Sequence, residues 1–397
     1  MLTLDMVYDA RKVLKDIVVE TRLVKANNIV ENCDLYIKPE NLQRTGSFKL
    51  RGSGYKIAGL NEDEKKRGVI ACSAGNHSQG VALAATKMGI PSYICMPDTA
   101  PISKVEATKR FGAQVTLVKG CYDDAYNKAI EMRDEMGYTF VHPFNDEKVI
   151  AGQGTIGLEI LDGIDDVDAV IVPIGGGGLI SGISFAIKSL RPSVKVYGVQ
   201  AAGAASMFKS IKNGKIECLD SVSTIADGIA VKQPGDNTFE IVSKYVDDIA
   251  TVTEDEIATA ILTLIEKQKM IAEGAGAVSV AAAMYKKFPI EGKKVVCVVS
   301  GGNIDVTSLS RVINRGLLNT GRTATLLIEL LDKPGQLNLV SQIIGGCGGN
   351  ILEVHHERLS TTENINACHL RVELETRNFA HIEEITNKLK EAGLKIL

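Results

Sequence analysis

Residues 45 to 52 read TGSFKLRG, a stretch that places one long amine, Lys49, among small residues. Ser47 or Thr45 can cap a helix that begins near Phe48, and Lys49 would then lie in its first turn. The positive end of a helix dipole disfavours a protonated amine. Because an amine attacks a carbonyl only when it is unprotonated, we expect a lysine with a lowered pKa that can form an imine.

Three loops rich in glycine and polar residues each follow an apolar run. They read SAGNHSQG from Ser73, GGGGL from Gly175 and SGGN from Ser300. In open α/β sheets the carboxyl ends of the strands form the ligand crevice, so we expect the three loops to face one site. The backbone N–H groups of Gly175–Leu179, followed by a helical pattern, would make a phosphate cradle.

Two more familiar phosphate motifs fit poorly. GGGGL lacks the Lys-Ser/Thr pair of a P-loop, and GQGTIG at 152–157 has dinucleotide-loop spacing without a strand before it or an acidic residue about 20 residues later. A lysine amine, a phosphate cradle and polar loops at one crevice instead indicate pyridoxal 5′-phosphate (PLP).

Short β-branched apolar runs alternate with helical patterns and must position these groups. The expected strands are 68–73, 91–97, 114–118, 168–174, 194–199 and 293–300. Their nearly continuous apolar character is typical of parallel strands covered on both faces. A helix is expected from Thr253, with Thr253 and Glu256 as a capping box. We predict an open, doubly wound α/β fold.

The pattern changes near residue 320. Strand-like runs at 323–332, 350–360 and 366–376, with helical stretches at 337–345 and 380–392, predict a β-α-β-β-α-β order. This is a small α+β domain of the ferredoxin-like kind.

Composition excludes several classes of protein. The 397 residues are 45% hydrophobic and 23% charged with a net charge of −3, so neither nucleic-acid nor membrane binding is expected. The N-terminal segment has no apolar signal core. The eight cysteines are scattered without a C-x-x-C pair, which favours buried reduced thiols in a cytoplasmic protein over disulfides or a zinc site.

The motif series ENLQRTGSFKLRG, ACSAGNHSQG, PIGGGGLISG, TIADG and VVSGGNID resembles that of the threonine dehydratases (threonine ammonia-lyases), which are fold-type II, tryptophan-synthase-like PLP enzymes. The match runs from roughly residue 15 to 315. DKPGQL at 332–337 resembles the first turn of an ACT domain. The resemblance implies a two-lobed catalytic domain over 1–320, with a smaller lobe of about 50–150 nested in the larger, and an ACT regulatory domain over 321–397.

The resemblance also assigns roles to residues. It implies that Lys49 bonds the cofactor covalently, that Asn76 hydrogen-bonds its phenolic oxygen and that Ser300 pairs with the pyridine nitrogen. The phosphate would be held by Gly175, Gly176, Gly177, Gly178 and Leu179. The substrate carboxylate would be bound by Ser73, Ala74, Gly75, Asn76 and His77, although His77 also fits a packed core histidine. An effector would bind near Pro334 and Gly335, and no metal site is expected.

A hydroxyl at Ser300 leaves the pyridine nitrogen largely neutral, which favours elimination over transamination. The implied path is removal of the α-proton of threonine or serine by Lys49, loss of the β-hydroxyl, and hydrolysis of the released enamine to 2-oxobutanoate or pyruvate with ammonia. Serine racemase is the nearest alternative, but Ala74 stands where those enzymes carry a second acid/base serine. Gln200 and Ser206 stand where they carry acidic metal ligands.

An inactive amino-acid sensor is a second alternative, from a different class of protein. Three properties stay open: the metabolic role (isoleucine synthesis or threonine catabolism), the effector (an amino acid or an adenine nucleotide), and the subunit number. A single ACT domain per chain implies pairing across subunits, hence a homodimer or homotetramer.

Overall fold

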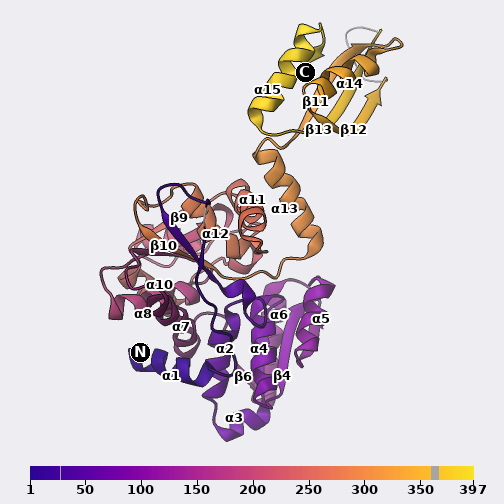
Figure 1. Cartoon of the computed structure of the whole chain (residues 1–397). Coiled ribbons are helices and arrows are strands. Elements are labelled where there is room, and N and C mark those ends of the chain that lie inside the picture. The colour runs from indigo at the N-terminus through magenta and orange to yellow at the C-terminus, as the bar shows by residue number, and fades with distance from the viewer. Residues whose placement is uncertain (27, 359–365) are drawn as a thin grey trace. The chain divides into compact units, whose positions relative to one another are not determined.

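The fold is drawn in Figure 1, a computed structural model that describes residues 1–26, 28–358 and 366–397. The chain divides into two units, Met1–Val306 and Thr307–Leu397.

The larger sheet of the first unit has the strand order β1-β2-β10-β7-β8-β9. Its strands are β1 (Val24–Lys25), β2 (Asp34–Pro39), β7 (Ala169–Pro173), β8 (Lys195–Ala201), β9 (Asp248–Val252) and β10 (Lys294–Val299). All neighbours are parallel except β1, which pairs antiparallel with β2 at the edge. The last strand of the unit, β10, therefore lies inside the sheet, between β2 and β7.

A second sheet is built from one continuous part of the chain. Its order is β5-β4-β3-β6, all parallel, from strands β3 (Val69–Cys72), β4 (Ser92–Pro97), β5 (Gln114–Val118) and β6 (Thr139–Phe140). Figure 1 shows this sheet with α4, α5 and α6 around it. The two sheets correspond to the two lobes of an open α/β architecture.

The six strands expected from sequence are all present, with ends shifted by at most two residues. Five of them were recognisable because they are buried almost throughout. The sixth, β5, is only partly buried. The runs that escaped prediction are β1, β2, β6 and β9, which are short or carry charged residues.

Within the described residues of the first unit, twelve α-helices surround these sheets. They are α1 (Leu4–Leu14), α2 (Lys49–Ala58), α3 (Glu62–Arg67), α4 (Asn76–Lys87), α5 (Ile102–Arg110), α6 (Tyr122–Met136), α7 (Glu147–Gly163), α8 (Gly178–Leu190), α9 (Ser206–Asn213), α10 (Asp236–Tyr245), α11 (Glu254–Thr263) and α12 (Gly274–Met284). The expected capping box of Thr253 and Glu256 is confirmed at the start of α11, which continues as a π-helical segment, Leu264–Gln268.

The GQGTIG segment lies inside α7 and is not a nucleotide loop. A Cβ placed on Gly152 would lie 2.7 Å from the Cα of Gly52. The glycines at 52 and 152 thus let the backbones of α2 and α7 approach closely.

The second unit has the strand order β12-β13-β11-β14, with all pairs antiparallel. Its elements are β11 (Thr323–Leu331), α14 (Gln336–Gly346), β12 (Asn350–Glu357), β13 (Ala367–Glu375), α15 (Phe379–Glu391) and β14 (Lys395–Ile396), preceded by α13 (Val306–Asn319). The predicted β-α-β-β-α-β order is confirmed. The last two residues of the predicted strand 350–360 lie outside the described residues.

The cysteines are all free thiols. Cys72, Cys95, Cys297 and Cys368 are buried, as expected, but Cys121 and Cys218 are exposed, so the expectation of burial was wrong for these two. Among the helices of the described ranges, none has the length and apolar character needed to cross a membrane.

Candidate active site

Lys49 is the first residue of α2 and so lies in the first turn of the helix, as the sequence predicted, but the expected cap was wrong. No side chain caps this helix: the Thr45 hydroxyl donates to Ser47 O, and the buried Ser47 hydroxyl has no partner among the described residues. The Phe48 N–H donates to Ser300 O at 3.1 Å instead. The helix start is therefore held by the loop that follows β10, far away in sequence.

The Lys49 amine is enclosed by protein groups. Its Nζ donates to Pro143 O at 2.8 Å and lies 5.3 Å from the centroid of the Phe48 ring. Burial lowers the pKa of Lys49 to about 8, although the negative charge of Glu273 opposes this shift. About a tenth of the amine is therefore unprotonated at pH 7, far more than for an ordinary lysine, and the unprotonated amine is the form that makes an imine.

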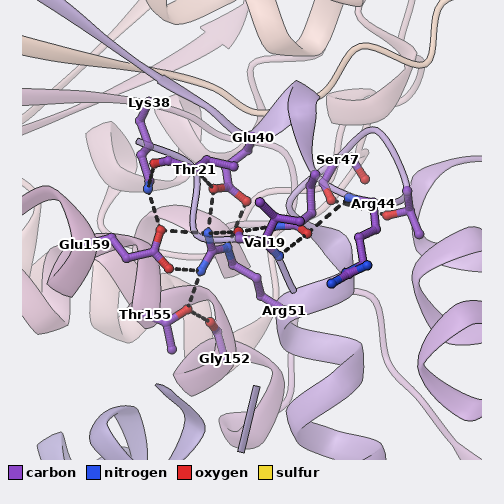
Figure 2. Close-up of polar contacts among 12 residues, drawn as sticks. Val19, Thr21, Lys38, Glu40, Arg44, Ser47, Arg51, Gly152, Thr155 and Glu159 are labelled. Atoms are coloured by element: carbon purple, nitrogen blue, oxygen red, sulfur yellow. Dashed lines mark hydrogen bonds and ion pairs between the residues drawn. The ribbon is translucent and has the colours of Figure 1, made fainter. Parts of the chain in front are cut away.

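A buried ion network fixes the position of α2. Figure 2 shows the Arg51 guanidinium between two carboxylates, with two bonds of 2.8 Å to Glu40 and bonds of 2.5 and 2.8 Å to Glu159. Lys38 pairs with Glu159, and the Thr21 hydroxyl donates to Glu40 at 2.5 Å. Two cations and two anions thus balance in the interior.

The network ties three elements together, since Arg51 lies on α2, Glu159 on α7, and Lys38 at the end of β2. Burial alone would raise the pKa of Glu40, but the charge of Arg51 outweighs it and holds that pKa below the ordinary value. Arg51 is two residues after Lys49. Fixing its guanidinium therefore also fixes the first turn of α2 and the direction of the amine.

A second group of polar side chains joins two of the glycine-rich loops. Asn76, at the start of α4, donates from Nδ2 to Glu273 Oε1 at 2.6 Å. Asn303 donates to Asn76 Oδ1 at 2.8 Å and to Thr45 O at 2.7 Å. Burial raises the pKa of Glu273 to about 7, and the negative charge of Asp227 is the next largest cause of this shift. Sequence reasoning selected Asn76 but missed Glu273 and Asn303.

The loop Ser73–Asn76 is partly exposed, and His77 is not. The Ser73 hydroxyl accepts from the Gly75 N–H at 3.2 Å. A Cβ on Gly75 would meet nothing within 4 Å, so this loop borders open space. His77 is 3% exposed, and its Nε2 lies 2.8 Å from Val141 O. Burial lowers the pKa of His77 to about 3, and the positive charge of Lys49 is the next largest cause of this shift. His77 is therefore a neutral, packed histidine.

Three of the four consecutive glycines, 175–177, lie between β7 and α8, and the fourth, Gly178, is the first residue of α8. Gly177 is the residue before the first turn of α8, with φ of +99°, and no side chain caps that turn. A Cβ on Gly177 would lie 2.7 Å from the Thr238 Cβ, and one on Gly178 would lie 2.8 Å from the Phe144 Cβ. Leu179 is buried behind them. Backbone N–H groups without side-chain partners at a helix N-terminus, lined by atoms that exclude a Cβ, fit a phosphate group.

Ser300 directly follows β10 and is 2% exposed. Its hydroxyl donates to Ala275 O at 3.2 Å. A buried hydroxyl with a long bond of this kind retains the ability to pair with a better acceptor, as a neutral pyridine nitrogen is. The residues present therefore fit PLP at each of its polar groups.

The remaining residues considered from sequence lie elsewhere. Gln200 and Ser206 are buried, and their side chains bond to backbone groups, with the Ser206 hydroxyl donating to Val231 O at 2.8 Å. Pro334 and Gly335 lie in the second unit, between β11 and α14. Gly335 precedes the first turn of α14 with φ of +93°.

Residues 14–301 match the protein family described as pyridoxal-phosphate dependent enzyme. The chain belongs to this family. Two relatives carry more specific names. This pyridoxal-phosphate dependent enzyme is 50% identical to the L-threonine ammonia-lyase of Thermotoga maritima, over 100% of this chain and 99% of the relative. It is 45% identical to the catabolic L-threonine dehydratase of Escherichia coli strain K12, over 78% of this chain and 95% of the relative.

Solved structures resemble it in the same way. The processed form of threonine deaminase isoform 2 from Solanum lycopersicum aligns with a TM-score of 0.76 at 36% identity, covering 79% of this chain and 88% of that one. Maize serine racemase aligns with a TM-score of 0.75 at 34% identity, covering 80% and 98%. These likenesses confirm the expected fold-type II architecture for the PLP-dependent part of the chain.

Proposed function

We propose that this PLP-dependent enzyme deaminates L-threonine to 2-oxobutanoate and ammonia, and L-serine to pyruvate as a secondary activity. The observation that carries the proposal is the Lys49 amine, which has a pKa lowered to about 8 and lies at the start of α2. The glycine cradle before α8 and the Asn76 side chain supply the remaining contacts. The name of the T. maritima relative supports the choice of substrate.

Each polar group of the cofactor has a residue that would hold it. Lys49 would bond it covalently, Gly175–Leu179 would hold its phosphate, and Asn76 would bond its phenolic oxygen. Ser300 would pair with its ring nitrogen. When bound, PLP supplies an electron sink for the carbon that loses the α-proton.

The proton is handled by Lys49. Once the amine of the substrate has displaced Lys49 from the cofactor, the freed neutral Nζ would accept the α-proton of the substrate. A pKa near neutrality suits a group that must both accept and return a proton. Pro143 O, at 2.8 Å, orients the amine. The loop Ser73–His77 would bind the substrate carboxylate through its N–H groups, beside the open space at Gly75.

Racemisation is the competing reaction, since maize serine racemase has a similar structure. A racemase must return a proton from the opposite side, and the methyl group of Ala74 cannot donate one. Gln200 and Ser206 offer no carboxylate to a divalent ion, and their side chains already bond to the backbone. Elimination is therefore favoured over racemisation.

An assay of keto acid and ammonia formed from L-threonine tests the proposal directly. We expect 2-oxobutanoate and ammonia in equal amounts, activity that survives EDTA, and unreacted L-serine that stays L during turnover. Borohydride reduction should fix the cofactor on the peptide that contains Lys49. Attachment to another lysine, or D-serine formed as fast as pyruvate, would overturn the assignment.

We further propose that the second unit is an ACT domain that regulates the first, in a homodimer or homotetramer with effector sites near Pro334 and Gly335. One relative supports the separation of roles. The E. coli protein is matched over 95% of its length, but the match covers only 78% of this chain. A protein named as a dehydratase therefore lacks a segment about as long as the second unit. The effector is an amino acid or an adenine nucleotide, and we place the enzyme in the cytoplasm.

A chain ending at Val306 tests this proposal. We expect the full chain to respond to isoleucine or AMP, and the shortened chain to retain PLP and threonine deamination but lose that response. An unchanged response in the shortened chain would place the regulatory site in the first unit.

A further inference from the structure

Three side chains of different chemistry meet in the second unit. Asp332 follows β11, His356 lies on β12 and Cys368 lies on β13. One oxygen, nitrogen or sulfur atom from each lies within 4.8 Å of the other two. His356 Nε2 and Cys368 Sγ lie 3.0 Å apart.

The strand register explains why these side chains share a face. Directly paired residues of an antiparallel sheet project to the same side, as do alternate residues of one strand. His356 pairs with Leu370, which is two residues from Cys368, and Cys368 pairs with Leu330, which is two residues before Asp332. All three side chains therefore project from the face that holds the core residues Leu330 and Leu370.

An irregularity in β12 selects His356 over its neighbour. The register shifts between Ile351 and Glu353, so an extra residue is inserted there. Without this bulge, His355 would face the core side, because a shift of one residue exchanges the faces of a strand. His355 instead lies on the opposite face and pairs with Glu353 at 2.9 Å.

We propose that Asp332, His356 and Cys368 bind a divalent transition-metal ion of the zinc class. Imidazole nitrogen, thiolate sulfur and carboxylate oxygen are the ligands that Zn²⁺ and Co²⁺ accept together, whereas Mg²⁺ and Ca²⁺ prefer oxygen alone. Bond lengths of about 2.0–2.3 Å place tetrahedral ligand atoms roughly 3.3–3.8 Å apart. Small side-chain rotations reach that spacing from the observed one.

The surroundings suit such a site. The Cys368 side chain is buried, while Asp332 and His356 are exposed, so an ion can enter from solvent and meet a sulfur already fixed in the core. A thiolate and a carboxylate neutralise a doubly charged ion. Arg358 Nε lies 3.5 Å from Asp332 Oδ1, but this exposed ion pair is weak and can give way. Three protein ligands leave a fourth position for water or another donor.

No local spacing marks this group in the sequence, because its members come from two strands and from the segment after a third, and the bulge in β12 cannot be recognised from sequence. The inference does not depend on the proposed reaction. It concerns the second unit alone, and the metal is additional to PLP.

The test uses the full-length PLP-bound protein with Cys121→Ser and Cys218→Ser, which remove the two exposed thiols. After treatment with a chelator and a reductant, the protein is titrated with Co²⁺. We expect one Co²⁺ ion to bind per chain. The bound ion should give the visible absorption bands of tetrahedral cobalt and a thiolate-to-cobalt charge-transfer band. Added Zn²⁺ should displace Co²⁺ and abolish both signals. Cys368→Ser and His356→Gln should each weaken Zn²⁺ binding at least about 100-fold, more than loss of an outer partner costs.

Matched controls exist in the same unit. His355→Gln and Cys347→Ser change the same residue types at positions outside the group of three, and both variants should bind Zn²⁺ like the parent. His356 is exposed, so His356→Gln tests the site even where Cys368→Ser unfolds the domain. The inference fails if the parent binds no Co²⁺, if bound Co²⁺ shows no thiolate band, or if His356→Gln binds Zn²⁺ as the parent does.

Discussion

Asn76 and Glu273, 197 positions apart in the sequence, are joined by a hydrogen bond of 2.6 Å between the amide nitrogen and the carboxyl oxygen. The bond links the start of α4 in one lobe to the residue before α12 in the other. It also connects a residue selected for cofactor contact to a buried acid that no sequence motif marked. Glu273 is therefore a positioning residue for Asn76, and its protonation state should affect the whole site.

The first prediction concerns Glu273→Gln in cofactor-free protein. The folded-state pKa of Glu273 is raised to about 7 from 4.5, so the fold favours the neutral acid. This contribution to stability is complete below pH 4.5 and is lost as the pH rises through 7, with a size of up to about 3 kcal/mol. The melting temperature of the parent, relative to Glu273→Gln, should fall between pH 5 and 8. A difference in melting temperature between the two proteins that does not change with pH would contradict this prediction. Because the charge of Asp227 helps to raise the pKa of Glu273, Asp227→Asn should move the pH-dependent change in stability to lower pH.

The second prediction concerns the rate at which the cofactor-free enzyme attaches PLP covalently. Only neutral Lys49 reacts, and its pKa is lowered to about 8. The rate should rise about tenfold per pH unit below 8 and level off above it. Absorbance after rapid mixing measures this rate. A midpoint near 10.5, the value of an ordinary lysine, would refute it.

The third prediction concerns the ion network around Arg51. Arg51→Met leaves Glu40 and Glu159 with too little positive charge in the interior and should lower the free energy of unfolding by about 3–5 kcal/mol. Denaturation by urea measures the loss. Arg44→Met, at the exposed arginine nearby, is the control and should have little effect. Adding Glu40→Gln to Arg51→Met should recover part of the stability, and no recovery would show that the charges are not coupled.

The fourth prediction separates two glycines of the site. In Gly177→Ala, a residue with a side chain must adopt a left-handed backbone conformation, and its Cβ meets Thr238. The conformation alone costs about 1–2 kcal/mol, so PLP affinity should fall tenfold or more. Gly75→Ala meets no neighbour, so it should keep PLP while raising the KM for threonine. Gly214→Ala, with φ of +66° and no close neighbour, controls for conformation. If Gly177→Ala binds PLP as tightly as the parent does, the glycines before α8 do not hold the phosphate.

The parts of the fold that could be predicted are those with local causes. Strands such as β7 and β10 are apolar throughout because both faces are covered, and that property is visible in a short window. β2 escaped because it contains Lys38, a charged residue whose burial depends on Glu159, 121 positions away. Local patterns carry no information about such a partner.

The residues of the candidate site also fall into those that local sequence predicts and those that depend on distant partners. Lys49 and the glycine loops were recognisable because their chemistry and backbone freedom are properties of the residues themselves. The cap of α2 was mispredicted because a backbone bond to Ser300 O replaced a local side-chain bond. Glu273 and Asn303 were missed because their role exists only where the two lobes meet.

The place of β10 in the larger sheet has a consequence for synthesis on the ribosome. The strands β3–β6 all lie within 69–140, so the smaller sheet can form while the rest of the first unit is still being translated. The larger sheet cannot, because β10, its last strand to be made, must enter between β2 and β7. Until residue 299 has emerged, one edge of β2 and one of β7 stay open to wrong pairing. Nascent chains stopped before β10 should therefore bind chaperones, and chains extended past it should be released.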